Sequence, residues 1–151
     1  MMGEVTTDYS ALAARIASLT EGETDAVALM ATIACELHHS DGRFDWTGFY
    51  RVTEPGLLKI GPYQGGHGCL AIPFDRGVCG ACARTEEVQI VPDVEAFPGH
   101  IACASSTRSE IVLPVFRDGA LIAVLDIDSD RPDAFGRDDA EALARILGDA
   151  F

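Results

Sequence analysis

The chain has 151 residues, 48% of them hydrophobic and 23% charged, which suits a globular domain that buries a core without disulfide bonds. The formal charge of −13 argues against nucleic acid or an anionic membrane as a partner, and it favours a cationic or zwitterionic ligand. Residues 1–10 lack the basic and apolar stretches of a secretory signal. The longest apolar runs are too short to span a bilayer. We therefore expect a cytoplasmic protein whose thiols are reduced by default.

Helical periodicity predicts two helices in the first 40 residues. Asp8 can cap the first helix, in which Leu19 occupies one of the inward positions. Thr24 can cap the second helix, where Cys35 is expected to be a buried small hydrophobic residue. The two helices should pack on the rest of the domain through their apolar faces.

Strand patterns follow the helices and enclose an irregular middle. Residues 44–52 and 57–60 predict an antiparallel hairpin, and alternation places Trp46 and Tyr50 on one face. We expect a loop over residues 61–68, a short helix over 77–84 and a long loop over 92–109, a length that is often functional. Further strands are predicted at 69–74, 88–91, 110–116 and 120–127, and a last helix at 137–150. This order predicts an α+β fold, with a mainly antiparallel central sheet flanked by N- and C-terminal helices.

Four of the five cysteines lie between residues 61 and 110, which in a reducing compartment indicates catalysis, redox sensing or metal binding. Cys79 and Cys82 form a C-x-x-C. Cys79 lies near the start of the predicted short helix, where backbone N–H groups favour a thiolate, and Cys82 is expected to point into packing. Structural zinc would need two further ligands, for which the sequence offers Cys69, Cys103, His67 and His100. Their spacing contains no second close pair, which weakens the zinc interpretation.

Cys103 lies in the long predicted loop and precedes a run of serine and threonine residues. A thiolate near such polar groups, with Arg108 or His100 at hand, could be activated as a nucleophile. The alternative is an ordinary packed cysteine in a loop.

Two carboxylates end the last predicted strand. Asp126 and Asp128 are two residues apart, so their side chains share one strand face. Together they could bind a cation or an ammonium group. Capping of the following turn is the alternative for Asp128, although it leaves Asp126 without a role.

A series of segments in fixed order carries a family resemblance. The segments are DWTGFY (45–50), GPYQG (61–65), IPF (72–74), RGVCG (76–80), VPDV (91–94), FPGHIAC (97–103), RSEIVLP (108–114) and VLDIDS (124–129). In them the chain resembles the free methionine-(R)-sulfoxide reductases, which are stand-alone GAF domains. The resemblance implies one GAF domain over residues 1–151. The chain departs from the family pattern at Ala104, where an acidic residue is expected, in the block at 67–71, and in the additional thiol of Cys82.

The resemblance implies a thiol-based reaction with no bound cofactor or metal. Cys103 would attack the sulfur of free methionine sulfoxide and become a sulfenic acid. Cys69 matches the resolving thiol that would form a disulfide with Cys103, and Cys79 matches a third cysteine that exchanges into a second disulfide. Thioredoxin, kept reduced by NADPH and thioredoxin reductase, would restore the thiols.

The resemblance also implies a substrate pocket. Trp46 and Tyr50 match the aromatic residues around the methyl end of the substrate. Glu110, Asp126 and Asp128 match the pocket acids, which would hold the sulfoxide oxygen and the ammonium group. The sequence does not assign the protonated acid, because crowded carboxylates raise one another's pKa.

Two other functions remain as alternatives: a non-catalytic GAF-type sensor and a zinc-stabilised interaction module. Arg76, Arg108 and backbone donors are candidates for binding the substrate carboxylate. The preference for the R over the S sulfoxide rests on the resemblance alone. A homodimer through the terminal helices is left open.

Overall fold

The computed structural model describes residues 7–101 and 103–151. The expectations for residues 1–6 and for Ala102 lie outside this range. The helices and strands are α1 (Tyr9–Leu19), α2 (Ala26–Ser40), β1 (Trp46–Glu54), β2 (Leu57–Gln64), β3 (Ala71–Pro73), α3 (Gly77–Thr85), β4 (Gln89–Val91), the 3₁₀ helix η1 (Val94–Ala96), β5 (Ser109–Arg117), β6 (Ala120–Ser129) and α4 (Arg137–Ala150). None of these helices is long and apolar enough to cross a membrane.

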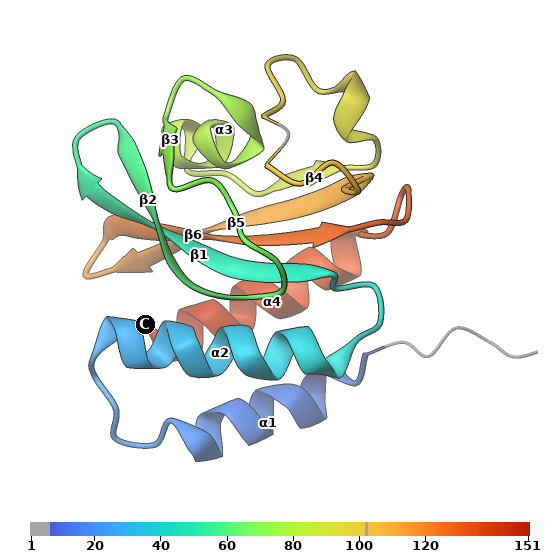
Figure 1. The fold of residues 1–151 in the computed structure, drawn as a ribbon. Coiled ribbons are helices and arrows are strands. Elements are labelled where there is room, and N and C mark those ends of the chain that lie inside the picture. Colours follow the sequence, from blue (N-terminus) through green and yellow to red (C-terminus); the bar gives the residue numbers. More distant parts are fainter. Residues whose placement is uncertain (1–6, 102) are drawn as a thin grey trace, which may run out of the picture.

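One sheet separates the molecule into two sides. Its strand order is β3-β2-β1-β6-β5-β4, and the strand pairs are antiparallel. Helices α1, α2 and α4 cover one face, whereas α3 and the segments around β3 and β4 lie over the other (Figure 1). This confirms the predicted α+β class with terminal helices on the sheet.

Strand alternation divides the core in two. Phe49 on β1 packs with the terminal helices, whereas Trp46 and Tyr50 on the same strand point into the second cluster, beneath α3. Both clusters contain fully buried side chains. The predicted shared face of the two aromatic residues is therefore confirmed, and it is the face opposite the terminal helices.

Several local predictions were wrong. Strand β2 continues to Gln64, through part of the predicted 61–68 loop, because Tyr63 and Gln64 pair with β1. Helix α2 is capped by the side chain of Asp25, which accepts from the Ala28 N–H at 2.9 Å, and not by Thr24. Leu19 is 54% exposed.

Other predictions from the sequence were confirmed only in part. Cys35 is half-buried, not fully buried. The predicted 92–109 loop contains the 3₁₀ helix η1, and its last residue, Ser109, already belongs to β5. Pro114 lies in β5 beyond the three residues that pair with β4, so its missing N–H leaves no gap in that ladder.

A buried charge cluster ties the helical layer together. Arg43 lies 2.7 Å from Asp41 and 2.9 Å from Asp139 on α4, and it donates to the Ala134 carbonyl at 2.8 Å. The Tyr9 hydroxyl on α1 donates to Asp139 at 2.6 Å. The first helix, the turn before β1 and the last helix are thus joined at one guanidinium.

Candidate functional site

The sheet register gathers the predicted binding residues on one face. Asp128 on β6 lies opposite Trp46 on β1 and opposite Glu110 on β5. Asp126 lies two positions away, opposite Gly48. Because residues at i and i+2 and their direct cross-strand partners point the same way, these side chains project together toward α3.

Aromatic rings form one wall of this site. Trp46 stacks on Tyr50 with ring centroids 5.7 Å apart and on Tyr63 at 5.3 Å. Its indole Nε1 donates to the Gly66 carbonyl at 2.7 Å, which fixes the ring. A Cβ on Gly68 would lie 2.9 Å from the Tyr50 hydroxyl, so the segment after β2 closes directly onto the aromatic pair.

Three carboxyl groups form the floor, and they are not equivalent. Burial, followed by the neighbouring carboxylates, raises the pKa of Asp126 well above its usual value, and burial and Glu110 do the same for Asp128. Burial also raises the pKa of Glu110, but the His100 imidazole and hydrogen bonding with both aspartates outweigh it and lower the pKa. Oδ1 of each aspartate is buried with no hydrogen-bond partner among the described residues. The floor therefore combines Glu110, whose pKa is lowered, with two aspartates whose pKa values are raised and whose Oδ1 atoms have no partner among the described residues.

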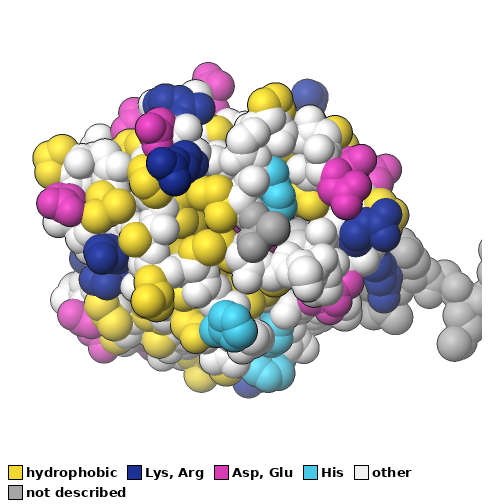
Figure 2. All heavy atoms as spheres, turned by 45° about the horizontal axis from the view of Figure 1, so that its top comes forward, with side chains coloured by type: hydrophobic (Ala, Val, Ile, Leu, Met, Phe, Trp, Pro, Cys, Tyr) yellow, Lys and Arg dark blue, Asp and Glu magenta, His cyan; other side chains and the backbone are white. Residues whose placement is uncertain are grey.

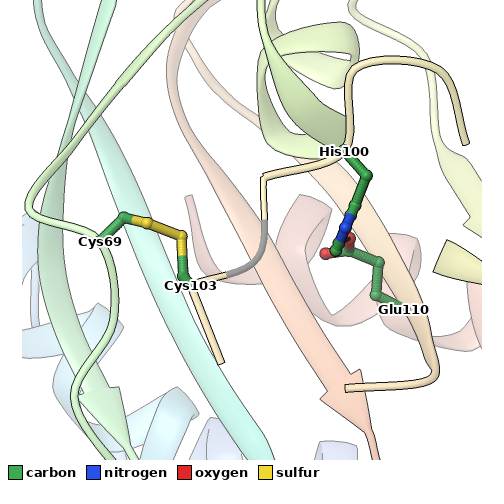
Figure 3. Close-up of a disulfide and its surroundings, with 4 residues drawn as sticks. All are labelled: Cys69, His100, Cys103 and Glu110. Carbon is green, nitrogen blue, oxygen red and sulfur yellow. Dashed lines mark ion pairs between the residues drawn. A yellow bond between two sulfur atoms is a disulfide. The ribbon is translucent and has the colours of Figure 1, made fainter. Parts of the chain in front are cut away.

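A disulfide joins Cys69 and Cys103, which are 34 positions apart in the sequence and have 5.3 Å between their Cα atoms (Figure 3). Cys69 lies between β2 and β3, and Cys103 lies in the segment before β5. His100 points toward Glu110, with Nε2 3.6 Å from Oε1, and not toward the sulfur atoms (Figure 3). Its expected place beside the Cys103 thiol is therefore wrong in this disulfide form, and Arg108 is exposed.

Cys79 and Cys82 lie on α3 in different surroundings. Cys79 faces the acids and is 4% exposed, and burial and the charges of Asp126 and Glu110 raise its pKa well above the usual value. The expected thiolate at the helix start is therefore wrong, because burial and nearby carboxylates outweigh the helix N–H groups. Cys82 packs in the core as predicted, and burial raises its pKa to about 12.

These groups line one pocket beneath the disulfide. Among the predicted site residues, the lining includes Trp46, Tyr50, Cys79, Cys103, Glu110, Asp126 and Asp128. Residues that the sequence had not assigned to the substrate also line it, namely His67, Gly68, Ile72, Gly77, Val78, His100, Ile101, Ala104 and Thr107. The cavity volume is about 30 Å³, room for one or two water molecules. The disulfide form is thus closed around a small polar space.

The proposed ligands for the substrate carboxylate are not in this pocket. Among the described residues that line it, neither Arg76 nor Arg108 is present. Arg76 is exposed and lies 3.9 Å from the Asp75 carboxylate. On the face that carries α3 and the 92–108 segment, hydrophobic side chains gather in the middle and charged side chains lie mainly around the edge (Figure 2).

The structure also separates the zinc ligands that the sequence offered. Cys69 and Cys103 are joined to each other, and Cys82 packs in the core. In the described part of the chain, the group that could hold a metal is instead Cys79, Glu110 and Asp126, whose ligand atoms lie within 4.8 Å of one another. The positions of these residues therefore do not support a zinc-stabilised fold built on the C-x-x-C.

A six-stranded antiparallel sheet with a small pocket under α3 defines a GAF domain, and in this chain a disulfide lies at that pocket. The family described as GAF domain matches residues 20–150. A solved structure entitled "structure of fRMsr of Staphylococcus aureus (reduced form)" is 38% identical with a TM-score of 0.92, covering 98% of this chain and 96% of that one.

Relatives narrow the class further. The free methionine-R-sulfoxide reductase of Escherichia coli (strain K12) is 39% identical over 86% of this chain and 78% of that protein. The structure of free methionine-R-sulfoxide reductase from Neisseria meningitidis, in complex with its substrate, is 40% identical with a TM-score of 0.88, covering 98% of this chain and 91% of that one. The chain belongs to the free methionine-(R)-sulfoxide reductase family.

Proposed function

We propose that this protein reduces free L-methionine-(R)-sulfoxide to methionine. The observation that carries the proposal is the Cys69–Cys103 disulfide at a pocket lined by aromatic rings and buried acids. Family membership supports the same activity. A redox-active cysteine pair beside a site for a small zwitterion is what this reaction requires.

Recognition follows from the charges of the pocket. We assign the ionised Glu110 to the substrate ammonium group, since a charge-assisted hydrogen bond is strong when buried. The protonated carboxyls of Asp126 and Asp128 can donate to the sulfoxide oxygen. Trp46 and Tyr50 would pack against the methylsulfinyl end of the substrate.

The reaction then needs one thiolate and one acid. The Cys103 thiolate attacks the sulfoxide sulfur, while an aspartic acid gives its proton to the oxygen. The sulfoxide gains two electrons and leaves as methionine. Cys103 keeps the oxygen as a sulfenic acid.

Resolution uses the second cysteine. The Cys69 thiol attacks the sulfenic sulfur, water leaves, and the disulfide forms. Thioredoxin, in a cytoplasmic pool driven by NADPH and thioredoxin reductase, would reduce this disulfide. We assign Cys79 an auxiliary exchange role, for which its buried thiol must first lose its proton.

The proposal is tested by thioredoxin-coupled NADPH consumption with the free R sulfoxide, the free S sulfoxide and a peptide-bound sulfoxide. We expect turnover of the free R form, none with Cys103→Ser, and normal turnover with Cys35→Ser, whose half-buried thiol lies outside the pocket. No turnover of the free R form by the wild-type protein would refute the proposal. Ligand binding without turnover would instead favour the sensor alternative.

A further inference from the structure

The buried group of Cys79, Glu110 and Asp126 has the donor atoms of a metal site. One thiol sulfur and two carboxylate oxygens lie within 4.8 Å of one another, and the three side chains are at most 6% exposed. A second observation points the same way. Oδ1 of Asp126, which is 5% exposed, lines the pocket without a hydrogen-bond partner among the described residues.

We propose that Cys79, Glu110 and Asp126 bind one Zn²⁺ ion, with a water molecule from the pocket as the fourth ligand. Three protein ligands and one open position are a common arrangement for zinc. The cavity volume of about 30 Å³ leaves room for that water. On binding, the Cys79 thiol releases its proton and sulfur coordinates as the thiolate.

The donor set selects among cations. A thiolate favours Zn²⁺ or its heavier analogue Cd²⁺ over Mg²⁺ and Ca²⁺, which prefer sites built from oxygen alone. Bonds of about 2.3 Å to sulfur and about 2.1 Å to oxygen place ligand atoms about 3.6 Å apart in a tetrahedron. The group therefore has to contract by at most about an ångström, and rotation of its carboxyl groups can supply this. The net charge of −13 favours the approach of a cation.

The ion would occupy the acids that we assign to the substrate. Zn²⁺ on Glu110 and Asp126 replaces the substrate ammonium group and the acidic proton, and it also removes the Cys79 thiol from exchange. We therefore expect Zn²⁺ to inhibit reduction of methionine sulfoxide. This consequence rests on the proposed function, whereas the binding of the ion does not.

Binding is tested on the disulfide form, because the bond between Cys69 and Cys103 excludes both as ligands. Zn²⁺ is titrated calorimetrically, and Cd²⁺ is added to follow the ultraviolet charge-transfer band of a cadmium thiolate. We expect one ion per chain. Cys79→Ser should abolish the band, and Asp126→Asn should weaken affinity by about 100-fold, since even outer partners of a metal contribute 10- to 100-fold.

Matched controls separate this site from the other thiols. Cys82→Ala, one helical turn from Cys79, and Cys35→Ser, on α2, should bind both ions as the wild type does. Unchanged binding in Cys79→Ser or in Asp126→Asn would overturn the proposal, as would absence of binding by the wild type. If Zn²⁺ binds as proposed but turnover is absent even without it, the site stands and the proposed function fails.

Discussion

At the scale of single residues, neighbouring carboxyl groups on the pocket floor have pKa values shifted in opposite directions. Glu110 has the His100 side chain within 3.6 Å and holds a lowered pKa. For Asp126, burial and the neighbouring carboxylates raise the pKa instead. Crowded carboxylates do not all ionise in a buried site, so the opposite shifts favour an anion at Glu110 and an acid at Asp126. The proposed reaction uses both, the anion for the ammonium group and the acid for the sulfoxide oxygen.

Asp126→Asn should therefore stabilise the fold at high pH while it impairs activity. The pKa of the Asp126 carboxyl is higher in the folded state than in the unfolded state. Its contribution to stability is therefore complete below the pKa of the unfolded state, and it is lost as the pH rises toward the pKa of the folded state. The amide of asparagine does not ionise, so the variant does not lose this stability as the pH rises. We expect the variant to be more stable than the wild type by about 1–3 kcal/mol at pH 8 and nearly equal to it at about pH 3, below the unfolded pKa of about 3.9. Urea unfolding at both values checks this; equal differences at both would contradict it.

Gly68 tests how closely the segment after β2 must approach the aromatic wall. A Cβ there would lie 2.9 Å from the Tyr50 hydroxyl and 3.0 Å from Trp46, whereas a Cβ on Gly66 would have nothing within 4 Å. Gly68→Ala should displace the rings and raise KM about tenfold, because small misplacements in a site are costly. Gly66→Ala should leave KM unchanged. Steady-state kinetics distinguish them, and equal effects would mean that crowding at Tyr50 is not the cause.

At the scale of elements, helix α3 holds Cys79 over the acids because it packs unusually close to β3. A Cβ on Gly80 would lie 2.7 Å from the Pro73 carbonyl oxygen and 2.9 Å from that of Phe74. These carbonyl oxygens belong to the backbone, so they cannot move aside as the end of a flexible side chain can. The glycine therefore sets the depth of the thiol in the pocket.

Replacing two helical glycines should accordingly have opposite effects. Gly80→Ala should destabilise the protein by about 1–3 kcal/mol through overpacking. Gly148→Ala in α4, where a Cβ would have nothing within 4 Å, should stabilise it by up to about 1 kcal/mol through helix propensity. Thermal or urea unfolding measures both. A stabilising Gly80→Ala would show that α3 can move away from β3.

The elements themselves could be predicted where periodicity was strong. Helix α4 begins and ends where expected, at Arg137 and Ala150, because its apolar face recurs with helical period. The predicted strand ended before Gly61, whereas Gly61 and the residues after it lie within β2. Pairing with β1 outweighs the weak strand propensity of glycine. Local sequence could not reveal that pairing.

At the scale of the whole molecule, one sheet has a layer packed on each face. The charge cluster around Arg43 joins the elements of the layer formed by α1, α2 and α4. Burial raises the pKa of Asp41 and Asp139, but Arg43 outweighs this and lowers both. We propose that residues 1–151 unfold as one unit, because the strands that carry the site also carry the helical core. A single coincident transition by fluorescence and circular dichroism is expected.

Arg43→Met should lower stability by about 3 kcal/mol, since it leaves two buried carboxylates without their cation. Arg15 offers a matched control, because its ion pair with Glu36 is on the surface, with the Arg15 side chain 65% exposed. Arg15→Met should change stability far less than Arg43→Met, because an exposed ion pair is screened by solvent. Chemical denaturation of the two variants measures this difference in stability. Equal losses of stability in both would contradict the prediction.

The site could be predicted from the sequence only in its chemical components. The family resemblance identified the cysteines, aromatics and acids of the site, and the structure brings all of them except Cys69 to the lining of one pocket, with Cys69 bonded to Cys103 beside it. The contact of His100 with Glu110 and the protonated Cys79 could not be predicted, because both depend on how α3 and the 92–108 segment fold over the sheet. Burial and through-space charge are properties of that packing and not of any local motif.

In the proposed reaction, Cys103 attacks the sulfoxide and Cys69 resolves the product. The most direct measurement is disulfide mapping by mass spectrometry after the reduced protein reacts with one equivalent of free methionine-(R)-sulfoxide and free thiols are alkylated. We expect one methionine released per chain and a Cys69–Cys103 link, with Cys35 and Cys82 alkylated after unfolding. A first-formed link from Cys103 to Cys79 or Cys82, or methionine release with all five cysteines still reduced, would contradict it.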